Sequence, residues 1–443
     1  MTSFADRLQA GIARLPAGRA LGRIVSCNGL VIEAAGPDAR LGELCEIEAA
    51  DGSGATFPAE VVGYRREHVL LMPYAHLAGI STRSLIRPTG RPLAVPVGDG
   101  LLGRVVDAFC RPLDEGPSIA FDAAYPLHRA PINPLDRAPI DTALDTGVRA
   151  IDGLLTLGIG QRVGILAGSG VGKSTLLGML ARQVVADVTV LALVGERGRE
   201  VGEFLEHALG PEGRKRSVVV VATSDAQALV RTHAAHAAHA IAEYFRDRGR
   251  SVLLVVDSMT RFAMAQREIG LAIGEPPTFR GYTPSVFSRL PTLLERCGRL
   301  RSGGAITGIY SVLVEGDDMN EPVADHMRAI LDGHIVLDRT LAARGHFPAI
   351  DVLHSASRLM GQVASPQAQA VARDVRKQMA VYAASRDLIE LGAHQRGVNP
   401  ALDAAIDVQA PIEAVLQQDP RDFTPSADTG RRFAAALRAG GGA

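Results

Sequence analysis

The sequence predicts an α/β protein in which a mostly parallel sheet is covered by helices, with a β-barrel domain before it and a helical domain after it. Three observations lead to this prediction. Apolar strand-like runs alternate with helical stretches between residues 150 and about 360, as in parallel sheets with helices on both faces. Short β-type runs broken by Gly, Pro and Asp fill about 20–95. From 365 onward the apolar pattern is helical.

Composition excludes several classes of protein. The chain has 443 residues, enough for two or three domains, and its 47 basic and 48 acidic residues give a net charge of −1. Such a balance creates no global field for nucleic acid or an anionic membrane. The four cysteines form no CxxC pair, so we expect reduced core thiols and neither a disulfide framework nor a zinc site. No apolar run is long enough to span a membrane, which predicts a cytoplasmic protein.

The first residues form a segment of their own. Phe4, Leu8, Ile12 and Leu15 are spaced by four, four and three, which places them on one face of a short helix. Such a helix has no core of its own. It is either a frayed terminus or a helix lying on the next domain, or else it docks onto a partner, and the sequence leaves these interpretations open.

Four segments follow from these patterns. The β-type runs at 19–95 favour a small barrel, although a sandwich fits their alternation almost as well. Residues 96–150 are rich in Pro and Gly and are expected to wrap the following domain. The predicted organisation is therefore an amphipathic segment at 1–18, a barrel at 19–95, an α/β domain at 96–365 and a helical domain at 366–443.

A glycine-rich loop carries the strongest chemical signal. The stretch AGSGVGKST at 167–175 follows the apolar run VGIL and precedes a helical pattern, which is the context of a phosphate-binding loop. Glycines let successive N–H groups turn toward one anion, and the helix N-terminus adds partial positive charge. The residues expected to bind ATP here are Gly168, Ser169, Gly170, Val171, Gly172, Lys173, Ser174 and Thr175. Of these, Lys173 would reach the β- and γ-phosphates and Ser174 would ligate Mg²⁺.

The lysine is informative because the chain otherwise uses arginine. Only Lys173, Lys215 and Lys377 occur among the 47 basic residues. A compact ammonium fits inside the loop, whereas a planar guanidinium is broader and favours a flat bidentate partner. Ala167 stands where the pattern has its first glycine, which is a mild departure.

Two acids complete the predicted site. Asp257 ends the apolar run SVLLVVD, where an acid can hold Mg²⁺ through its water shell. Glu196, in LVGERGRE at 193–200, is the first acid beyond another strand and is expected to polarise the attacking water. Glu200 is the alternative base, and a surface salt bridge with a neighbouring arginine is the non-catalytic interpretation. The spacing of His233, His236 and His239 by three is interpreted as helix packing, because no carboxylate or cysteine is interleaved.

These stretches resemble the flagellar protein-export ATPases of the type III secretion class, which are relatives of the catalytic subunit of rotary ATP synthases. The resemblance covers about 20–440. It rests on the phosphate loop, LVGERGREV and the stretches GRVVDAFCRPLDEGP, GEPPTFRGYTPSVFSRLP, EGDDMNEPVADHMRAILDGHIVLDR and FPAIDVLHSASR. DDMNEPVAD at 317–325 looks more like the flagellar branch than the injectisome or rotary branches.

The resemblance implies a RecA-like ATPase core in a homohexameric ring with ATP between protomers. Phe347 matches the aromatic that stacks on adenine, Arg358 matches the arginine that reaches a neighbour's γ-phosphate, and Arg197 follows the catalytic glutamate. Asp338 stands where serine is frequent in the family. Also implied are export chaperones and substrates, membrane proteins of the export gate, a stalk protein bound by the N-terminal segment, and a peripheral position at the cytoplasmic face of the export apparatus.

The expected function is Mg-ATP hydrolysis that drives unfolding or delivery of flagellar export substrates. A non-hydrolysing structural ring subunit would have no need of Glu196. A ring translocase on RNA would require a basic, aromatic-lined N-terminal domain, and 20–95 offers only Phe57, Tyr64 and Tyr74. A rotary ATP synthase role is the remaining alternative.

Overall fold

A computed structural model describes residues 20–75, 77 and 79–439. The predicted amphipathic segment at 1–18 lies outside these residues. The chain divides into two compact units, one with the described residues up to Leu93 together with Leu271–Glu275, the other with Ala94–Gly270 and the residues from Pro276 onward.

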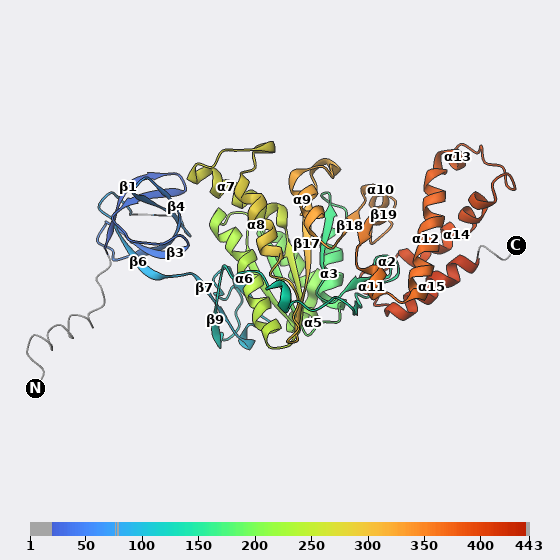
Figure 1. Ribbon diagram of the computed structural model, residues 1–443, viewed down its shortest axis with the longest axis horizontal. Coiled ribbons are helices and arrows are strands. Elements are labelled where there is room, and N and C mark those ends of the chain that lie inside the picture. The colour runs from blue at the N-terminus through green and yellow to red at the C-terminus, as the bar shows by residue number, and fades with distance from the viewer. Residues whose placement is uncertain (1–19, 76, 78, 440–443) are drawn as a thin grey trace, which may run out of the picture. The chain divides into compact units, whose positions relative to one another are not determined.

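The first unit is a closed six-stranded barrel. Its strands are β1 (Gly22–Asn28), β2 (Val31–Ala35), β3 (Glu43–Glu48), β4 (Thr56–Arg65), β5 (His68–Pro73) and β6 (Leu85–Pro92). They pair in the order β1-β2-β5-β4-β3-β6, and β6 returns to β1. Figure 1 shows this barrel in blue, with β1, β3, β4 and β6 labelled. Alternate residues point inward and form a core that includes Ile32, Ile47 and Ile86, each fully buried. Closure into a barrel is confirmed, and it leaves no open sheet edge.

The second unit contains a nine-stranded sheet in the order β19-β18-β12-β17-β15-β13-β14-β8, with β16 paired to β17. Its strands are β8 (Val105–Asp107), β12 (Arg162–Ala167), β13 (Val188–Val194), β14 (Ser217–Ala222), β15 (Ser251–Asp257), β16 (Gly298–Arg299), β17 (Ala305–Leu313), β18 (Gly333–Leu337) and β19 (Ile350–Ser357). All pairings among β18, β12, β17, β15, β13, β14 and β8 are parallel. The antiparallel additions are β19 and β16. Small ladders join β7 (Ala94–Val97) to β9 (Ala123–Pro126) and β10 (Ala143–Leu144) to β11 (Leu157–Gly158).

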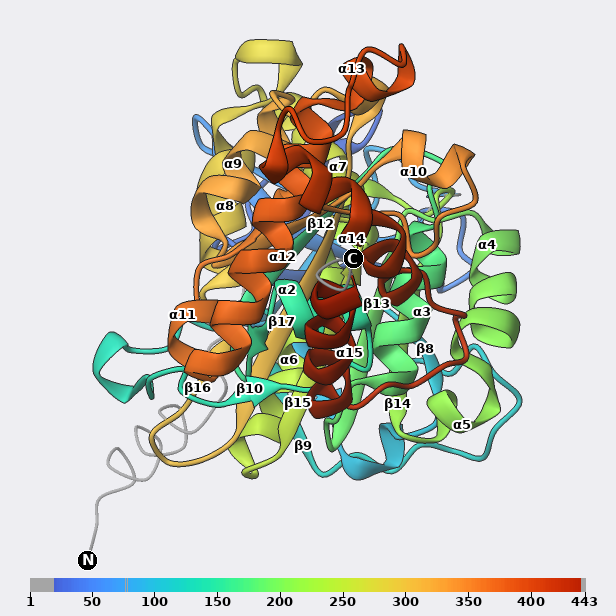
Figure 2. The same ribbon diagram turned by 90° about the vertical axis from the view of Figure 1, so that its right-hand side faces the viewer.

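Helices lie on both faces of this sheet (Figure 2). They are α2 (Arg149–Leu154), α3 (Lys173–Gln183), α4 (Gly198–Glu203), α5 (Gly210–Lys215), α6 (Ala228–Asp247), α7 (Met259–Ile273), α8 (Pro284–Leu294), α9 (Pro322–Ile330), α10 (Arg339–Ala343) and α11 (Met360–Val363). The central strands are buried on both faces, which explains why their sequences are almost continuously apolar.

The C-terminal domain is helical, as the sequence predicts. It contains α12 (Pro366–Ala384), α13 (Arg386–Glu390), α14 (Pro400–Leu416) and α15 (Ser426–Ala439). Ser365 and Asn399 cap α12 and α14 with side-chain acceptors, and a proline follows each cap at the first helical position. α12, α14 and α15 pack against one another and against α2.

The structure corrects one expectation about the cysteines and supports the packing interpretation for His239. Cys45, Cys110 and Cys297 are buried free thiols, but Cys27, one residue before the end of β1, is exposed. His239 lies buried in α6, where it hydrogen-bonds Ala235 O and the Tyr310 hydroxyl, and burial lowers its pKa to about 3. Across the described residues, no helix is both long and apolar enough to cross a membrane.

Candidate active site

The glycine-rich loop links the end of β12 to the start of α3. Gly170 and Gly172 have φ angles of +79° and +93°, in the left-handed region that favours glycine. Gly168 is needed for a different reason, since a side-chain carbon there would come within 2.3 Å of Asp317 Oδ1. Helix α3 begins at Lys173, so its first N–H groups face the loop. The local backbone is therefore that of an anion cradle.

Lys173 meets Asp257 across the carboxyl edge of the sheet. Asp257 is the last residue of β15, and its Oδ1 lies 2.5 Å from Lys173 Nζ. The Ser311 hydroxyl, on the intervening strand β17, donates to the same oxygen at 2.5 Å. Burial alone would lower the pKa of Lys173, but the Asp257 and Glu196 carboxylates outweigh it and raise that pKa. Lys173 is therefore held as a charged ammonium.

Glu196 completes the charged cluster. It follows β13 by two residues, and its Oε1 lies 3.5 Å from Lys173 Nζ. Burial, with smaller contributions from the Asp257 and Glu200 carboxylates, raises the pKa of Glu196 to about 7 even though Lys173 opposes the shift. A hydrogen bond from Glu196 lowers the pKa of Glu200. A carboxyl that titrates near neutral pH is suited to general-base work.

The cluster opens into a cavity of about 540 Å³, within the usual size range of ligand sites. The loop residues Gly168 to Thr175, except Val171, line it together with Gly195, Glu196, Arg197, Glu200, Ser224, Arg261 and Leu313. Val171 is buried in the core instead. The Arg197 side chain is 77% exposed, and it contacts Glu200 at 3.8 Å. Arg197 thus reaches the rim of the cavity and not its charged centre.

Two of the expected residues lie at opposite ends of the β18–β19 hairpin. Phe347 is at the loop end, where a side-chain carbon on Gly172 would lie 3.5 Å from its ring. Arg358 is exposed and directly follows Ser357, which pairs with Gly333 at the other end of the hairpin. At the loop end of β18, Leu337 pairs with Ala167, the last residue of β12. At the other end, the Asp332 carbonyl accepts the Arg358 N–H, and Asp332 is five residues from Leu337. That separation is about 16 Å along the strand, farther than an arginine side chain spans.

A second ion pair braces the rim of the loop. Arg339 Nε lies 3.0 Å from Asp317 Oδ2, and Arg339 Nη1 donates to Ser169 O at 3.2 Å. Asp338, where the family often has serine, caps α10 by accepting from Leu341 N at 2.8 Å. Aspartate and serine are both favoured caps, so this departure preserves the local structure.

The cavity and the contacts around it also include residues that sequence reasoning did not identify. Ser311 had a usable signal, because it is an isolated hydroxyl in the apolar strand AITGIYSVL. Arg261 and Ser224 gave none, since each follows the strand edge within an ordinary polar stretch. Asp317 and Arg339 both lie in the stretch EGDDMNEPVADHMRAILDGHIVLDR, but they are 22 residues apart, so no local pattern indicates that they pair.

The donor set fits Mg²⁺. Both contacts to the Asp257 carboxylate, from Lys173 and Ser311, go to Oδ1, which leaves Oδ2 for a hydrated cation. Ser174 is exposed in the first turn of α3 and offers a hydroxyl in the lining of the cavity. Carboxylate and hydroxyl oxygens with retained water are typical of Mg²⁺ at nucleotide sites.

A phosphate loop with a charged lysine, a strand-end aspartate and a raised-pKa glutamate at one sheet edge defines a P-loop nucleotide hydrolase. Comparison with known proteins refines this class. The profile of the "ATP synthase alpha/beta family, nucleotide-binding domain" matches residues 147–357, that of the family's beta-barrel domain matches 24–90, and that of the "T3SS EscN ATPase C-terminal domain" matches 364–435.

Relatives extend over nearly the whole chain. The "Flagellum-specific ATP synthase" of Bacillus subtilis is 54% identical over 397 residues, 90% of each protein. The "assembled ATPase EscN" of the enteropathogenic E. coli type III secretion system has a TM-score of 0.88 at 44% identity, over 94% of this chain and 100% of that one. EscN "in complex with its central stalk EscO" gives a TM-score of 0.86 with the same identity and coverage. The chain therefore belongs to the family of flagellum-specific and type III secretion ATPases, and it is an ATPase.

The raised pKa of Glu196 predicts the pH dependence of the enzyme. A general base works only when deprotonated, so kcat/KM should rise as pH increases through about 7. Glu200→Gln removes a carboxylate that raises this pKa, so the acidic limb of the kcat/KM profile should move to lower pH.

Glu203→Gln on the same helix is the matched control, because Glu203 is 56% exposed and faces Arg199 instead of the cluster. Its profile should match that of the wild type. If the acidic limb of the kcat/KM profile of Glu200→Gln did not move, this would contradict the effect of Glu200 on the pKa of Glu196. Complete loss of activity would identify Glu200 as the base.

Proposed function

We propose that this protein is the Mg-ATP-hydrolysing hexameric motor of the flagellar type III protein export apparatus, and that it drives delivery and unfolding of export substrates. The observation that carries the hydrolytic part is Glu196, which is partly buried 3.5 Å from Lys173 Nζ and has a pKa raised to about 7. Likeness to a flagellum-specific relative and to a type III secretion ATPase supports the setting in protein export.

Each residue has a distinct role in this proposal. The loop amides and Lys173 bind the β- and γ-phosphates, and Phe347 stacks on the adenine. Ser174 and Asp257 hold Mg²⁺, which supplies charge neutralisation at the phosphates when bound. Glu196 accepts a proton from the attacking water, and Ser311 holds the Asp257 carboxylate in orientation. Arg197, at the cavity rim, adds positive charge next to the base.

Arg358 acts on the neighbouring protomer in this proposal. Its base lies about 16 Å from the loop of its own chain along β18, so it can serve a γ-phosphate only if another chain supplies it. The related EscN structure is of an assembled ATPase, and a ring of six protomers would place Arg358 at the next site. A guanidinium supplied in trans accelerates such reactions by roughly 10³ to 10⁵ in other enzymes.

The same setting defines the proposed partners and location. EscN has been solved in complex with its central stalk EscO, and we expect an equivalent stalk protein here, bound through residues 1–18. Export chaperones, their substrates and the membrane proteins of the export gate are the other expected partners. They would place the ring peripherally at the cytoplasmic face of the export apparatus.

Three alternatives fit the observations less well. A non-hydrolysing structural ring subunit does not account for Glu196. An RNA translocase would present several aromatic side chains for base stacking, yet of the three in the barrel only Tyr64 is exposed, whereas Tyr74 is buried and Phe57 is partly buried against the core. A rotary synthase role shares the catalytic core, but the C-terminal domain matches a type III secretion profile.

The first test separates catalysis from binding. Glu196→Gln should keep ATP affinity within a few-fold, because the carboxylate acts on water and not on the nucleotide, while kcat falls by about 10² to 10⁴. Phosphate release and nucleotide binding are measured on the same preparation, with Glu206→Gln on the exposed part of the same segment as control. Wild-type turnover in Glu196→Gln would reject the assigned base and revive the structural-subunit alternative.

The second test asks whether the site is shared between chains. Arg358→Ala should bind ATP yet barely hydrolyse it, and Lys173→Ala should be inactive because its phosphate cradle lacks a cation. Mixing the two restores interfaces with an intact loop and an intact arginine, so some hydrolysis should return. Arg339→Ala is not a suitable control because Arg339 contacts the loop. The exposed Arg344, directly after α10, is preferable, as Arg344→Ala. Full activity of Arg358→Ala alone would exclude the shared site.

A further inference from the structure

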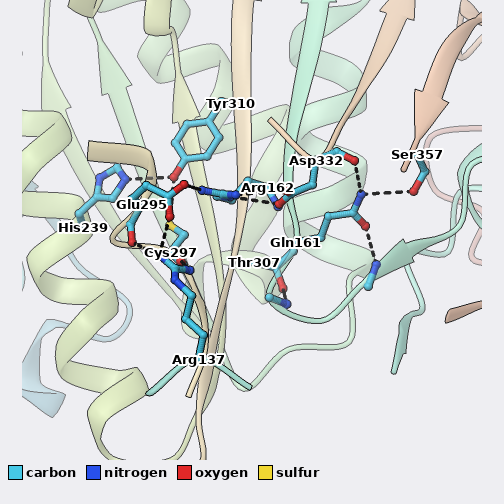
Figure 3. A network of polar contacts seen from close by, with 12 residues as sticks. Arg137, Gln161, Arg162, His239, Glu295, Cys297, Thr307, Tyr310, Asp332 and Ser357 are labelled. Carbon is cyan, nitrogen blue, oxygen red and sulfur yellow. Dashed lines mark hydrogen bonds and ion pairs between the residues drawn. The ribbon is translucent and has the colours of Figure 1, made fainter. Parts of the chain in front are cut away.

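Gln161 is a fully buried amide between two functional segments (Figure 3). It lies directly before β12, the strand that ends in the phosphate loop. Its Oε1 accepts from Gly158 N at 2.8 Å, while its Nε2 donates to Asp332 O at 3.1 Å and to Ser357 Oγ at 3.2 Å. Because a backbone N–H needs an acceptor and a carbonyl needs a donor, only this orientation of the amide satisfies its neighbours.

These contacts converge on the backbone from which Arg358 projects. The carbonyl of Asp332 accepts from Gln161 Nε2 and also from Arg358 N, the latter at 3.0 Å. Ser357, the preceding residue, donates its hydroxyl to Thr156 O at 2.8 Å. Gln161 therefore binds the residue before Arg358 and the carbonyl that holds Arg358 itself.

The other half of the network secures Asp332 to β12. Arg162 Nε and its backbone N each lie 3.0 Å from Asp332 Oδ2, and Arg162 Nη2 lies 3.0 Å from Oδ1. Gly333 packs so closely that a side-chain carbon would come within 2.6 Å of Ala356 O and 3.3 Å of Gln161 Nε2. The end of β19 is thus closely packed against Gly333. The Arg358 side chain itself is exposed and bonds only Arg328 O, at 3.2 Å, among the described residues.

We propose that Gln161 is a positioning residue for Arg358, fixing the end of β19 onto the start of the phosphate-loop strand so that the guanidinium is presented to the neighbouring protomer. The inference rests on the proposed trans role of Arg358. It adds that one buried amide connects β12, whose loop binds the nucleotide of the same chain, to Arg358, which acts on the nucleotide of the neighbouring protomer. Gln161 touches neither the loop nor the cavity, so it acts through Arg358.

The variant Gln161→Met tests this, because it keeps the length of the side chain and removes the three hydrogen bonds. We expect kcat about tenfold to a hundredfold lower, as for misplaced catalytic groups, with KM for ATP within about a few-fold of wild type. Thr307→Val is the matched control. It removes a buried hydrogen bond to Gly160 N, 2.8 Å in the same turn, without contact to β19, and its kcat should stay within about twofold of wild type.

A double-mutant cycle gives the decisive readout. If Gln161 acts through Arg358, adding Gln161→Met to Arg358→Ala should leave the residual single-turnover rate unchanged within about twofold. A general structural role would lower the rate equally in both backgrounds, and that result would overturn the proposal. The proposal would also be overturned if Gln161→Met kept the wild-type kcat while Arg358→Ala had a strongly lowered kcat.

The outcomes also separate this inference from the proposed function. A fully active Arg358→Ala would reject the trans arginine itself, and with it the inference. If Gln161→Met does not fold, as judged by its thermal unfolding, Ser357→Ala replaces it in the same cycle. That variant deletes one Gln161 contact and the bond to Thr156 O, and additive effects with Arg358→Ala would again overturn the proposal.

Discussion

The site depends on one constraint, which is that the parallel strands end at the same edge of the sheet. β12, β17, β15 and β13 are neighbours in that order, so Lys173, Ser311, Asp257 and Glu196 meet although they are up to 138 residues apart. Charges brought together in a buried place are tolerable only when paired. The contact between Lys173 and Asp257 satisfies that condition. Glu196 lies beside this pair, and its pKa is raised.

The antiparallel strand β19 has the opposite effect. By reversing direction beside β18, it carries the chain away from the phosphate loop, so Phe347 stays near the loop and Arg358 finishes at the amino end of the parallel strands. If β19 ran parallel to the seven parallel strands, the two residues would exchange ends, with Arg358 at the edge of the phosphate loop and Phe347 at the opposite edge. The direction of a single edge strand thus decides which residues of the proposed site belong to the chain that binds the nucleotide and which to its neighbour.

Local rules explain how much could be predicted from the sequence. The phosphate loop, the strand alternation and the acids after β13 and β15 are short-range patterns, and the barrel, the parallel sheet and the helical C-terminal domain followed from periodicity. Phe347 and Arg358 came only from family resemblance, since nothing in their surroundings signals a nucleotide. Gln161 was invisible because its partners Asp332 and Ser357 lie 171 and 196 residues away. The exposure of Cys27 was missed because residue type alone placed all four cysteines in the core, without regard to where each lies along its strand.

The burial of three of the four cysteines allows the natural chain to be labelled with a dye at one position. Burial raises the pKa of Cys45 and Cys110 to about 12 and that of Cys297 to about 11, which suppresses their thiolates at neutral pH. Cys27 on the barrel is the one exposed thiol of the four. A maleimide dye should therefore attach at a single position, in a different unit from the nucleotide cavity. Fluorescence exchange between labelled chains would then follow assembly in real time without any engineered residue.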